Sequence, residues 1–179
     1  VLENFVSDEA MLQFQPEEKR KEASYDLYSK HYSFMQSLFC YIVVSDLWTT
    51  DQAEAMTDII LSPTIDSSDA QMIVSAIMLS TMNSFDINKF HILTEVYKKA
   101  PDEVLRQKAL VGWALSMTDE VFFNEQSAYI HPLCDDPDTA KEIIDLQKQI
   151  IYCMNADKDN EVIQRDIIPT IMRNSNLDV

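Results

Sequence analysis

The chain contains very little glycine. Its 179 residues include one, Gly112, where average usage would give about a dozen. Tight β-hairpin turns, phosphate-binding loops and dinucleotide-binding turns all use glycine, either for positive φ or for close backbone approach. Residues that helices tolerate or favour, such as Leu, Ala, Glu, Gln and Lys, are plentiful. We therefore expect an all-α protein.

Basic residues are also scarce. The chain has 14 Lys and Arg against 30 Asp and Glu, a formal net charge of −16. Binding to nucleic acid needs a surplus of basic side chains, and so does docking on an anionic membrane. We therefore expect neither partner. An acidic surface keeps a protein soluble, and it also suits a basic protein partner.

Long apolar runs are missing, and cysteines are few. No run of about 18 apolar residues occurs, so no membrane span is expected. Cys40, Cys134 and Cys153 are widely spaced and form no CxxC pair. This favours reduced thiols and a cytoplasmic location, with Cys40 and Cys153 as small buried hydrophobic residues. The first residues carry neither an initiator Met nor a signal-peptide pattern, which leads us to expect a fragment of a longer chain.

An internal repeat is the strongest pattern. Residues 36–45, 71–80 and 107–116 align without gaps, at offsets of 35 and 36. Each segment opens with Gln, closes with Ser and is apolar at its third, fourth, seventh, eighth and ninth places, and a weaker copy begins at Gln147. Repeats of this length are typical of solenoids, in which stacked units bury an apolar stripe that one unit cannot bury alone.

Each copy is predicted to be the second helix of a pair. Prolines and capping residues place the helix ends. The expected helices run from Pro16 through the first copy, from Asp51 to Ser62, from a cap within residues 66–69 to Ser80, from Asp86 to Ala100, from Pro101 through the third copy, from Asp138 or Thr139 to Met154, and from Val162 to Met172. Residues 119–133 fit no single pattern, because the segment 121–123 suits a strand or a helix.

The third and seventh places of each copy lie four residues apart, on one helix face. We expect them to pack against neighbouring repeats, with Trp113 in that core. The sixth place is small in two copies, at Ala76 and Gly112, which permits close approach of helices; Tyr41 differs.

The unit spanning residues 85–116 resembles the HEAT and armadillo-like α-solenoids. Its first helix closes with Tyr97-Lys98-Lys99-Ala100, and its second carries Val104, Arg106 and Ala109 before Gly112. The resemblance covers residues 34–154, and the chain is also similar to a bacterial domain of unknown function. The likeness implies an α-α superhelix of stacked antiparallel helix pairs, with a period of about 35 and no catalytic residues. The whole chain, residues 1–179, would be one solenoid domain or a fragment of one, with an N-terminal arm or cap at 1–22, the clearest repeats at 23–118 and divergent helices at 119–179.

Patterns for chemistry are weak. His91 and Glu95 are four residues apart on one helix, but a metal centre needs more ligands than two. His31 and His131 are isolated, and His131 lies near Cys134 without a glycine-rich elbow. We therefore expect no catalytic residues, metal or cofactor. A metal-dependent helical hydrolase, the least favoured alternative, would require the three histidines to converge with acids.

The leading hypothesis is a non-catalytic scaffold or adaptor that binds a protein partner, which the charge suggests is basic. The alternative is a structural or regulatory module of a larger multidomain protein. The candidate partner-binding residues are Asp51, Glu54, Asp58, Asn88, Lys89 and Glu95. The aromatic residues Tyr25, Tyr28, Tyr32 and Phe34 are predicted to pack within a terminal helix; if exposed, they would instead form a binding surface.

Overall fold

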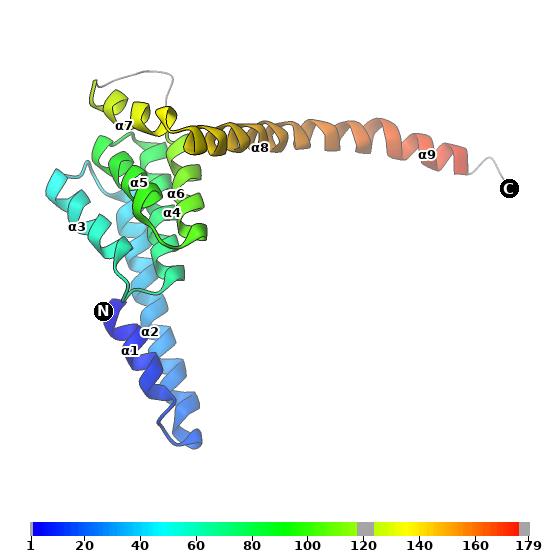
Figure 1. Ribbon diagram of the computed structural model, residues 1–179. Helices are drawn as coiled ribbons and strands as arrows, with labels where there is room; N and C mark the ends of the chain where they lie inside the picture. Colours follow the sequence, from blue (N-terminus) through cyan, green and yellow to red (C-terminus); the bar gives the residue numbers. More distant parts are fainter. Residues whose placement is uncertain (1, 118–123, 176–179) are drawn as a thin grey trace. The chain divides into compact units, whose positions relative to one another are not determined.

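The computed structural model describes residues 2–117 and 124–175. The described residues form helices and no strand, which confirms the all-α prediction. The elements are α1 (Leu2–Leu12), α2 (Glu17–Val44), α3 (Thr50–Leu61), α4 (Ser67–Asn83), α5 (Ile87–Lys99), α6 (Glu103–Leu115), α7 (Asn124–Asp135), α8 (Pro137–Val162), the π-helical turn η1 (Ile163–Ile167) and α9 (Ile168–Ser175) (Figure 1).

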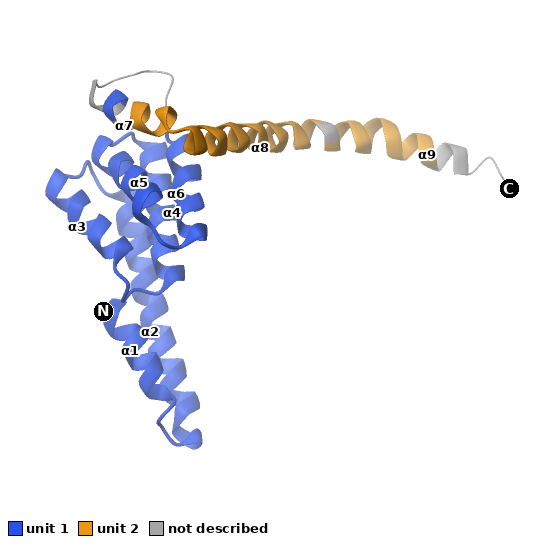
Figure 2. Cartoon of the chain, viewed as in Figure 1, with its two compact units in different colours: residues 1–129 blue, residues 130–179 orange. Residues whose placement is uncertain are grey.

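The chain divides into two compact units, Val1–Tyr129 and Ile130–Val179 (Figure 2). The sequence predicted subdivisions at residues 22 and 118 within one domain, whereas the contacts divide the chain at residue 129, within α7. Each unit is described by itself below.

In the first unit, helices two apart along the chain pack on each other. Helix α2 contacts α4, α4 contacts α6, and α3 contacts α5 (Figure 1). Helices α3 and α5 also contact α4, and α5 contacts α6. The even-numbered helices α2, α4 and α6 thus form one row, with α3 and α5 beside it. Helix α1 packs along the first half of α2.

Side-chain caps start the helices of the first unit. Asp66, Asp86 and Asp102 each accept a hydrogen bond from a backbone N–H in the first turn of the following helix. Thr49 and Gln52 form a reciprocal capping box at the start of α3. Because these side chains satisfy N–H groups that have no partner within the helix, they fix where each helix begins. The predicted starts near 51, 66 and 86 are confirmed, and Pro101 lies just before the cap of α6 rather than in its first turn.

The cap at Asp66 predicts an acid-dependent loss of stability. The hydroxyl of Ser68 and nearby backbone N–H groups hold the pKa of Asp66 below its usual 3.8, although partial burial opposes them. A carboxylate with a lowered pKa stabilises the fold above its unfolded pKa, and this contribution is lost as the pH falls through the folded pKa. Asn caps a helix about as well as Asp and does not titrate. We therefore expect Asp66→Asn to lose less stability than the parent between pH 6 and about pH 3 in urea unfolding; parallel losses would contradict the prediction.

The core of the first unit follows the repeat places. Ile42, Ile77 and Trp113 occupy the seventh place and are 0%, 0% and 3% exposed. At the third place Ile73 and Ala109 are buried and Leu38 is half-buried. The ninth place is exposed in all three copies, at Val44, Leu79 and Leu115. The predicted core position of Trp113 is confirmed, and its ring stacks on Phe90 at a centroid distance of 6.0 Å.

Gly112 lies where α6 approaches its neighbours. A Cβ atom added there would lie 3.2 Å from Cβ of Met78 on α4 and 3.3 Å from Cδ2 of Leu93 on α5. The residue has ordinary helical φ, so the requirement is for space and not for unusual backbone. This confirms that the small residue permits close helix approach.

Two expectations, one about the N-terminal arm and one about the cysteines, need correction. The N-terminal arm contains helix α1, which buries Phe5 and Leu12 against the rest of the unit. Cys40 is exposed, as are Cys134 and Cys153, so the prediction of buried thiols is wrong. Consecutive apolar residues on a helix point in all directions around its axis, and the three cysteines lie on sides of their helices that the core does not cover.

The second unit is helical from Pro137 to Ser175. Asp136, and not Asp138 or Thr139, provides the cap, because its carboxylate accepts the backbone N–H of Thr139 at 2.8 Å. Helix α8 continues past Met154 to Val162 and joins η1 and α9 directly, so the separate last helix is instead a continuation. Pro169, at the second residue of α9, lacks the N–H of a regular helix, and the π-helical turn directly precedes α9.

The segment 121–123 lies outside the described residues. In the part of the chain that is described, no helix combines the length and apolar character needed to cross a membrane.

Candidate functional site

Three of the predicted partner-binding residues meet between α3 and α5. Glu54 and Asp58 of α3 and Glu95 of α5 line a hollow of about 310 Å³, together with Ala53, Thr57, His91 and Lys99. We call it the α3–α5 hollow. The three acids share it because Glu54 and Asp58 are one helical turn apart on α3, and α3 packs on α5. Asp51 is exposed one turn earlier on α3 and does not line the hollow.

Lys89 does not face solvent, and the prediction that it contacts a partner is wrong. It is 1% exposed, and its ammonium donates to the carbonyls of Ser45 and Asp46, each at 3.1 Å, and to the hydroxyl of Ser80 at 2.9 Å. It also lies 3.8 Å from the Asp86 carboxylate. The residue holds the α2–α3 connection against α4 and α5, and sequence spacing alone could not distinguish this position from a surface one.

Asn88 is half-buried and has a similar structural role. Its side-chain N–H donates to the carbonyl of Trp48 at 2.7 Å, while the backbone N–H of Trp48 donates to Asp86 at 2.8 Å. These bonds fix the connection between α2 and α3 to the start of α5. Of the six predicted residues, Glu54, Asp58 and Glu95 line the hollow, Asp51 is exposed one turn away on α3, and Asn88 and Lys89 support the helices.

The charges of the hollow are partly balanced. Glu95 lies 2.7 Å from the ammonium of Lys99 and 3.5 Å from the His91 ring nitrogen. Partial burial raises the pKa of Glu95, but Lys99, His91 and Lys98 together outweigh burial, so that its pKa lies below the usual value. Its hydrogen bond to Glu95 also raises the pKa of Lys99. Lys99 thus forms its close ion pair with Glu95, and the Asp58 charge also helps to raise the pKa of Lys99; in the described part of the chain neither Glu54 nor Asp58 has a close ion pair of its own.

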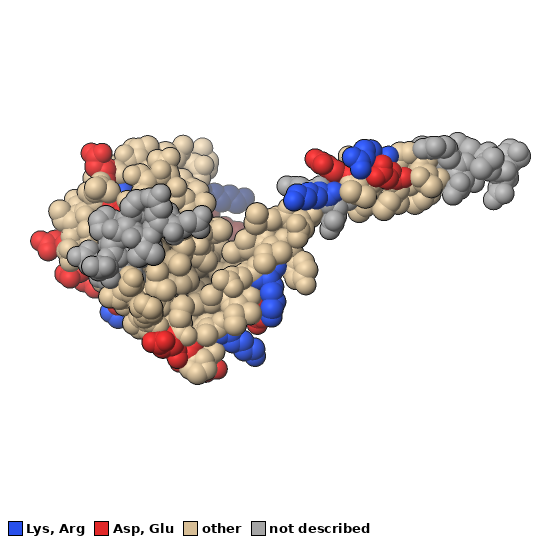
Figure 3. Space-filling model, turned by 90° about the horizontal axis from the view of Figure 1, so that it is seen from above, with Lys and Arg blue, Asp and Glu red and all other residues tan. Residues whose placement is uncertain are grey.

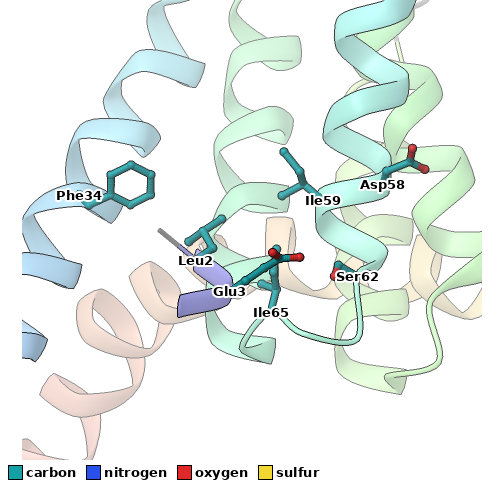
Figure 4. A pocket seen from close by; sticks show the side chains of 7 residues that line it. All are labelled: Leu2, Glu3, Phe34, Asp58, Ile59, Ser62 and Ile65. Carbon is teal, nitrogen blue, oxygen red and sulfur yellow. The ribbon is translucent and has the colours of Figure 1, made fainter. Parts of the chain in front are cut away.

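A second hollow lies on the other side of α3 and was missed from the sequence. It measures about 520 Å³ and is formed by α1, α2, α3 and the connection after α3. Leu2, Phe34 and Ile59 point toward this space, and Asp58 projects from the opposite side of α3 (Figure 4). We call it the α1–α3 groove. Asp58 lines both hollows, although its carboxylate is directed away from the apolar side chains of the groove (Figure 4). The groove could not be found from sequence because α1 was not predicted, although adjacent Asp58 and Ile59 were a signal that α3 has both an acidic and an apolar exposed side.

The described histidines do not form a metal centre. His31 bonds through Nε2 to Oδ1 of Asp69 at 2.9 Å and stacks under Phe5, whereas His91 belongs to the α3–α5 hollow. Across the described ranges, no three side chains of His, Cys, Asp or Glu come together in a way that could hold a metal ion.

The aromatic residues of α2 are more exposed than predicted. Tyr25 and Tyr32 are 76% and 69% exposed, which contradicts packing for these two. Tyr28 packs edge-on against Phe5 and donates to Glu9, a hydrogen bond that raises its pKa. Phe34 is half-buried and lines the α1–α3 groove.

The net charge does not by itself mark a binding surface. On the face shown in Figure 3, acidic side chains stand singly or in small groups, with basic side chains and wide uncharged areas between them. The two hollows beside α3 are therefore distinguished by their local composition and not by total charge.

Comparisons of the chain with protein-family models, with curated proteins and with solved structures found no match.

Proposed function

We propose that the first unit is a non-catalytic protein-binding scaffold built from helix-pair repeats of the HEAT-like kind, and that it binds a basic protein segment along α3 and α5. The observation that carries the proposal is the α3–α5 hollow, where Glu54, Asp58 and Glu95 converge with one lysine, Lys99, and the ring of His91. Lys99 pairs closely with Glu95 and opposes the Asp58 charge only from a greater distance, so one lysine faces three carboxylates and the excess acid can pair with Lys or Arg from a partner.

The repeat supports a solenoid form of the scaffold. The copies at 36–45, 71–80 and 107–116 lie on α2, α4 and α6, which pack in that order. Their seventh places are all buried and their ninth places are all exposed. Equivalent burial at equivalent places is what stacking of similar units produces. In such folds one helix of each pair lines a continuous binding surface, and α3 and α5 would have this role.

Charge reversal on α3 tests the proposal. The variant Asp51→Lys/Glu54→Lys/Asp58→Lys inverts the exposed acidic side of α3. A matched control, Glu18→Lys/Glu22→Lys/Asp26→Lys, makes the same change in charge at exposed positions of α2. Each protein serves as bait in native lysate at low and moderate salt, and captured proteins are identified by mass spectrometry.

We expect the parent and the α2 control to capture a stoichiometric, salt-sensitive partner. The α3 variant should capture less of it, by about tenfold or more, because several close charge pairs would be lost. Equal capture by both variants would contradict binding at α3. Capture of no stoichiometric protein by the parent would favour the alternative function, a structural or regulatory module of a larger multidomain protein.

The second unit gives that alternative a specific observation. Helix α8 exposes large apolar side chains, including Ile151 at 56% and Met154 at 70%. Exposed apolar area on a helix is often covered by another protein segment. Under the alternative, a neighbouring domain of the same polypeptide would supply that segment.

A further inference from the structure

The α1–α3 groove combines an apolar lining with acidic borders. Leu2 of α1, Phe34 of α2 and Ile59 of α3 supply apolar walls, and Ile65 adds another from the connection after α3 (Figure 4). The acidic residues at the groove are Glu3 and Asp58, and no basic side chain lines it. Its volume of about 520 Å³ falls within the range of about 300–1,000 Å³ that ligand sites occupy.

The walls of the groove are held in place by the fold. The Glu3 carboxylate accepts the hydroxyl of Thr64 at 3.0 Å, which ties the first turn of α1 to the connection after α3. Thr64 is in turn bonded to the hydroxyl of Ser62 at 2.7 Å. Behind the exposed Ile59, Ile60 anchors α3 in the core at 2% exposure. A groove whose walls are already positioned loses less entropy when it is occupied.

Asp58 connects the groove to the α3–α5 hollow. Ile59 is 38% exposed on the groove side of α3, and the Asp58 carboxylate projects on the other side, where Glu54 also lies. A partner segment that crosses α3 would thus contact first the apolar α1–α3 groove and then the carboxylates of the α3–α5 hollow. This order is complementary to an apolar side chain followed by basic ones.

We propose that the α1–α3 groove binds one apolar side chain of a partner peptide whose adjacent residues are Lys or Arg, and that these basic residues pair with Asp58 and Glu54. The inference rests on the proposed function and specifies its partner: a basic segment with an apolar anchor. The anchor supplies affinity through burial, and the basic residues fix the direction in which the segment lies across α3.

The test uses three synthetic peptides and the full chain. The first peptide carries one Leu flanked by Lys in an Ala background, the second replaces Leu with Ala, and the third replaces each Lys with Glu. Binding is measured by fluorescence anisotropy against the parent, Ile59→Glu and Leu79→Glu. Leu79 is a matched control because it is 41% exposed on α4 and lines neither hollow.

We expect the Leu peptide to bind the parent and Leu79→Glu alike, and to bind Ile59→Glu about tenfold or more weakly, as the loss of one buried apolar side chain implies. The Ala peptide should bind the parent more weakly than the Leu peptide does, by a similar factor, and the Glu peptide should not bind. The Asp58→Asn substitution should lower the affinity for the Leu peptide and reduce the salt dependence of its binding.

Three results would contradict the proposal that the α1–α3 groove binds an apolar side chain of a partner peptide. Equal binding of the Leu and Ala peptides would show that charge alone directs binding, which leaves the proposed function intact and removes the anchor. No binding of the Leu peptide would also contradict the proposed anchor. The proposed function would then be tested separately, by comparing the proteins that the parent and the α3 charge-reversal variant capture from lysate. A dimer in sedimentation that Ile59→Glu dissociates would assign the groove to a second copy of the chain.

Discussion

Replacement of Trp113 by Ala is expected to lower the free energy of unfolding by about 3–5 kcal/mol, the usual range for removing a large aromatic side chain from a core. Trp113 is 3% exposed and stacks on Phe90, which is itself fully buried on the neighbouring helix α5. The space left by the indole cannot close easily because Gly112, the adjacent residue, already holds α6 close to α4 and α5. Urea unfolding followed by circular dichroism measures the loss.

Trp113→Phe is the matched variant. The indole N–H of Trp113 has no acceptor among the described residues, so its removal leaves no new unpaired group behind. Phe keeps a ring against Phe90 and leaves a smaller space than Ala. We therefore expect a loss well below that of Trp113→Ala. An Ala variant as stable as the parent would show that this region contributes little to the folded state.

Replacement of Lys89 by Met is expected to lower the free energy of unfolding by about 3–5 kcal/mol, although Met nearly keeps the volume of the side chain. The change leaves the carbonyls of Ser45 and Asp46 without the ammonium that they share, and it leaves the buried Asp86 carboxylate without its nearest cation. Burial lowers the pKa of Lys89 below its usual 10.5, and the Asp86 charge opposes this only in part. The ammonium is therefore costly to bury, and its acceptors depend on it.

Lys98→Met provides the control on the same helix. Lys98 lies 3.8 Å from Glu95, but its side chain is 36% exposed, and exposed ion pairs contribute about 0–1 kcal/mol. The comparison uses urea unfolding at neutral pH. If both variants unfold at the same denaturant concentration, the hydrogen bonds of Lys89 do not hold the α2–α3 connection in the way that the structure indicates.

The helix boundaries of the first unit could be predicted because they depend on local chemistry. Aspartates that cap α4, α5 and α6 act on N–H groups only two or three residues away. The buried faces of α4 and α6 could also be predicted, because apolar residues four apart share a helix face. The separate helix α1 was missed because residues 1–12 lack a clear cap and mix acidic and apolar residues.

The candidate site could be predicted only in part. The sequence predicts Glu54, Asp58 and Glu95 as partner-binding residues on two helices, and the packing of α3 on α5 brings them together. Lys89 belongs to the same predicted set and is buried, because whether a charged side chain on a helix faces solvent depends on which neighbours pack there. The α1–α3 groove depends on three helices and one connection, which are distant in sequence.

The sequence by itself determined that this protein is helical, where most helices of the first unit begin and which residues of the repeat form its core. These properties follow from backbone propensity, capping and helical periodicity, all of which act over a few residues. Only the tertiary structure decided that Lys89 is an internal support, that Cys40 is exposed and that α3 has a hollow on each side. Burial and the convergence of side chains depend on how whole helices pack, and that packing is set by contacts between residues that are far apart along the chain.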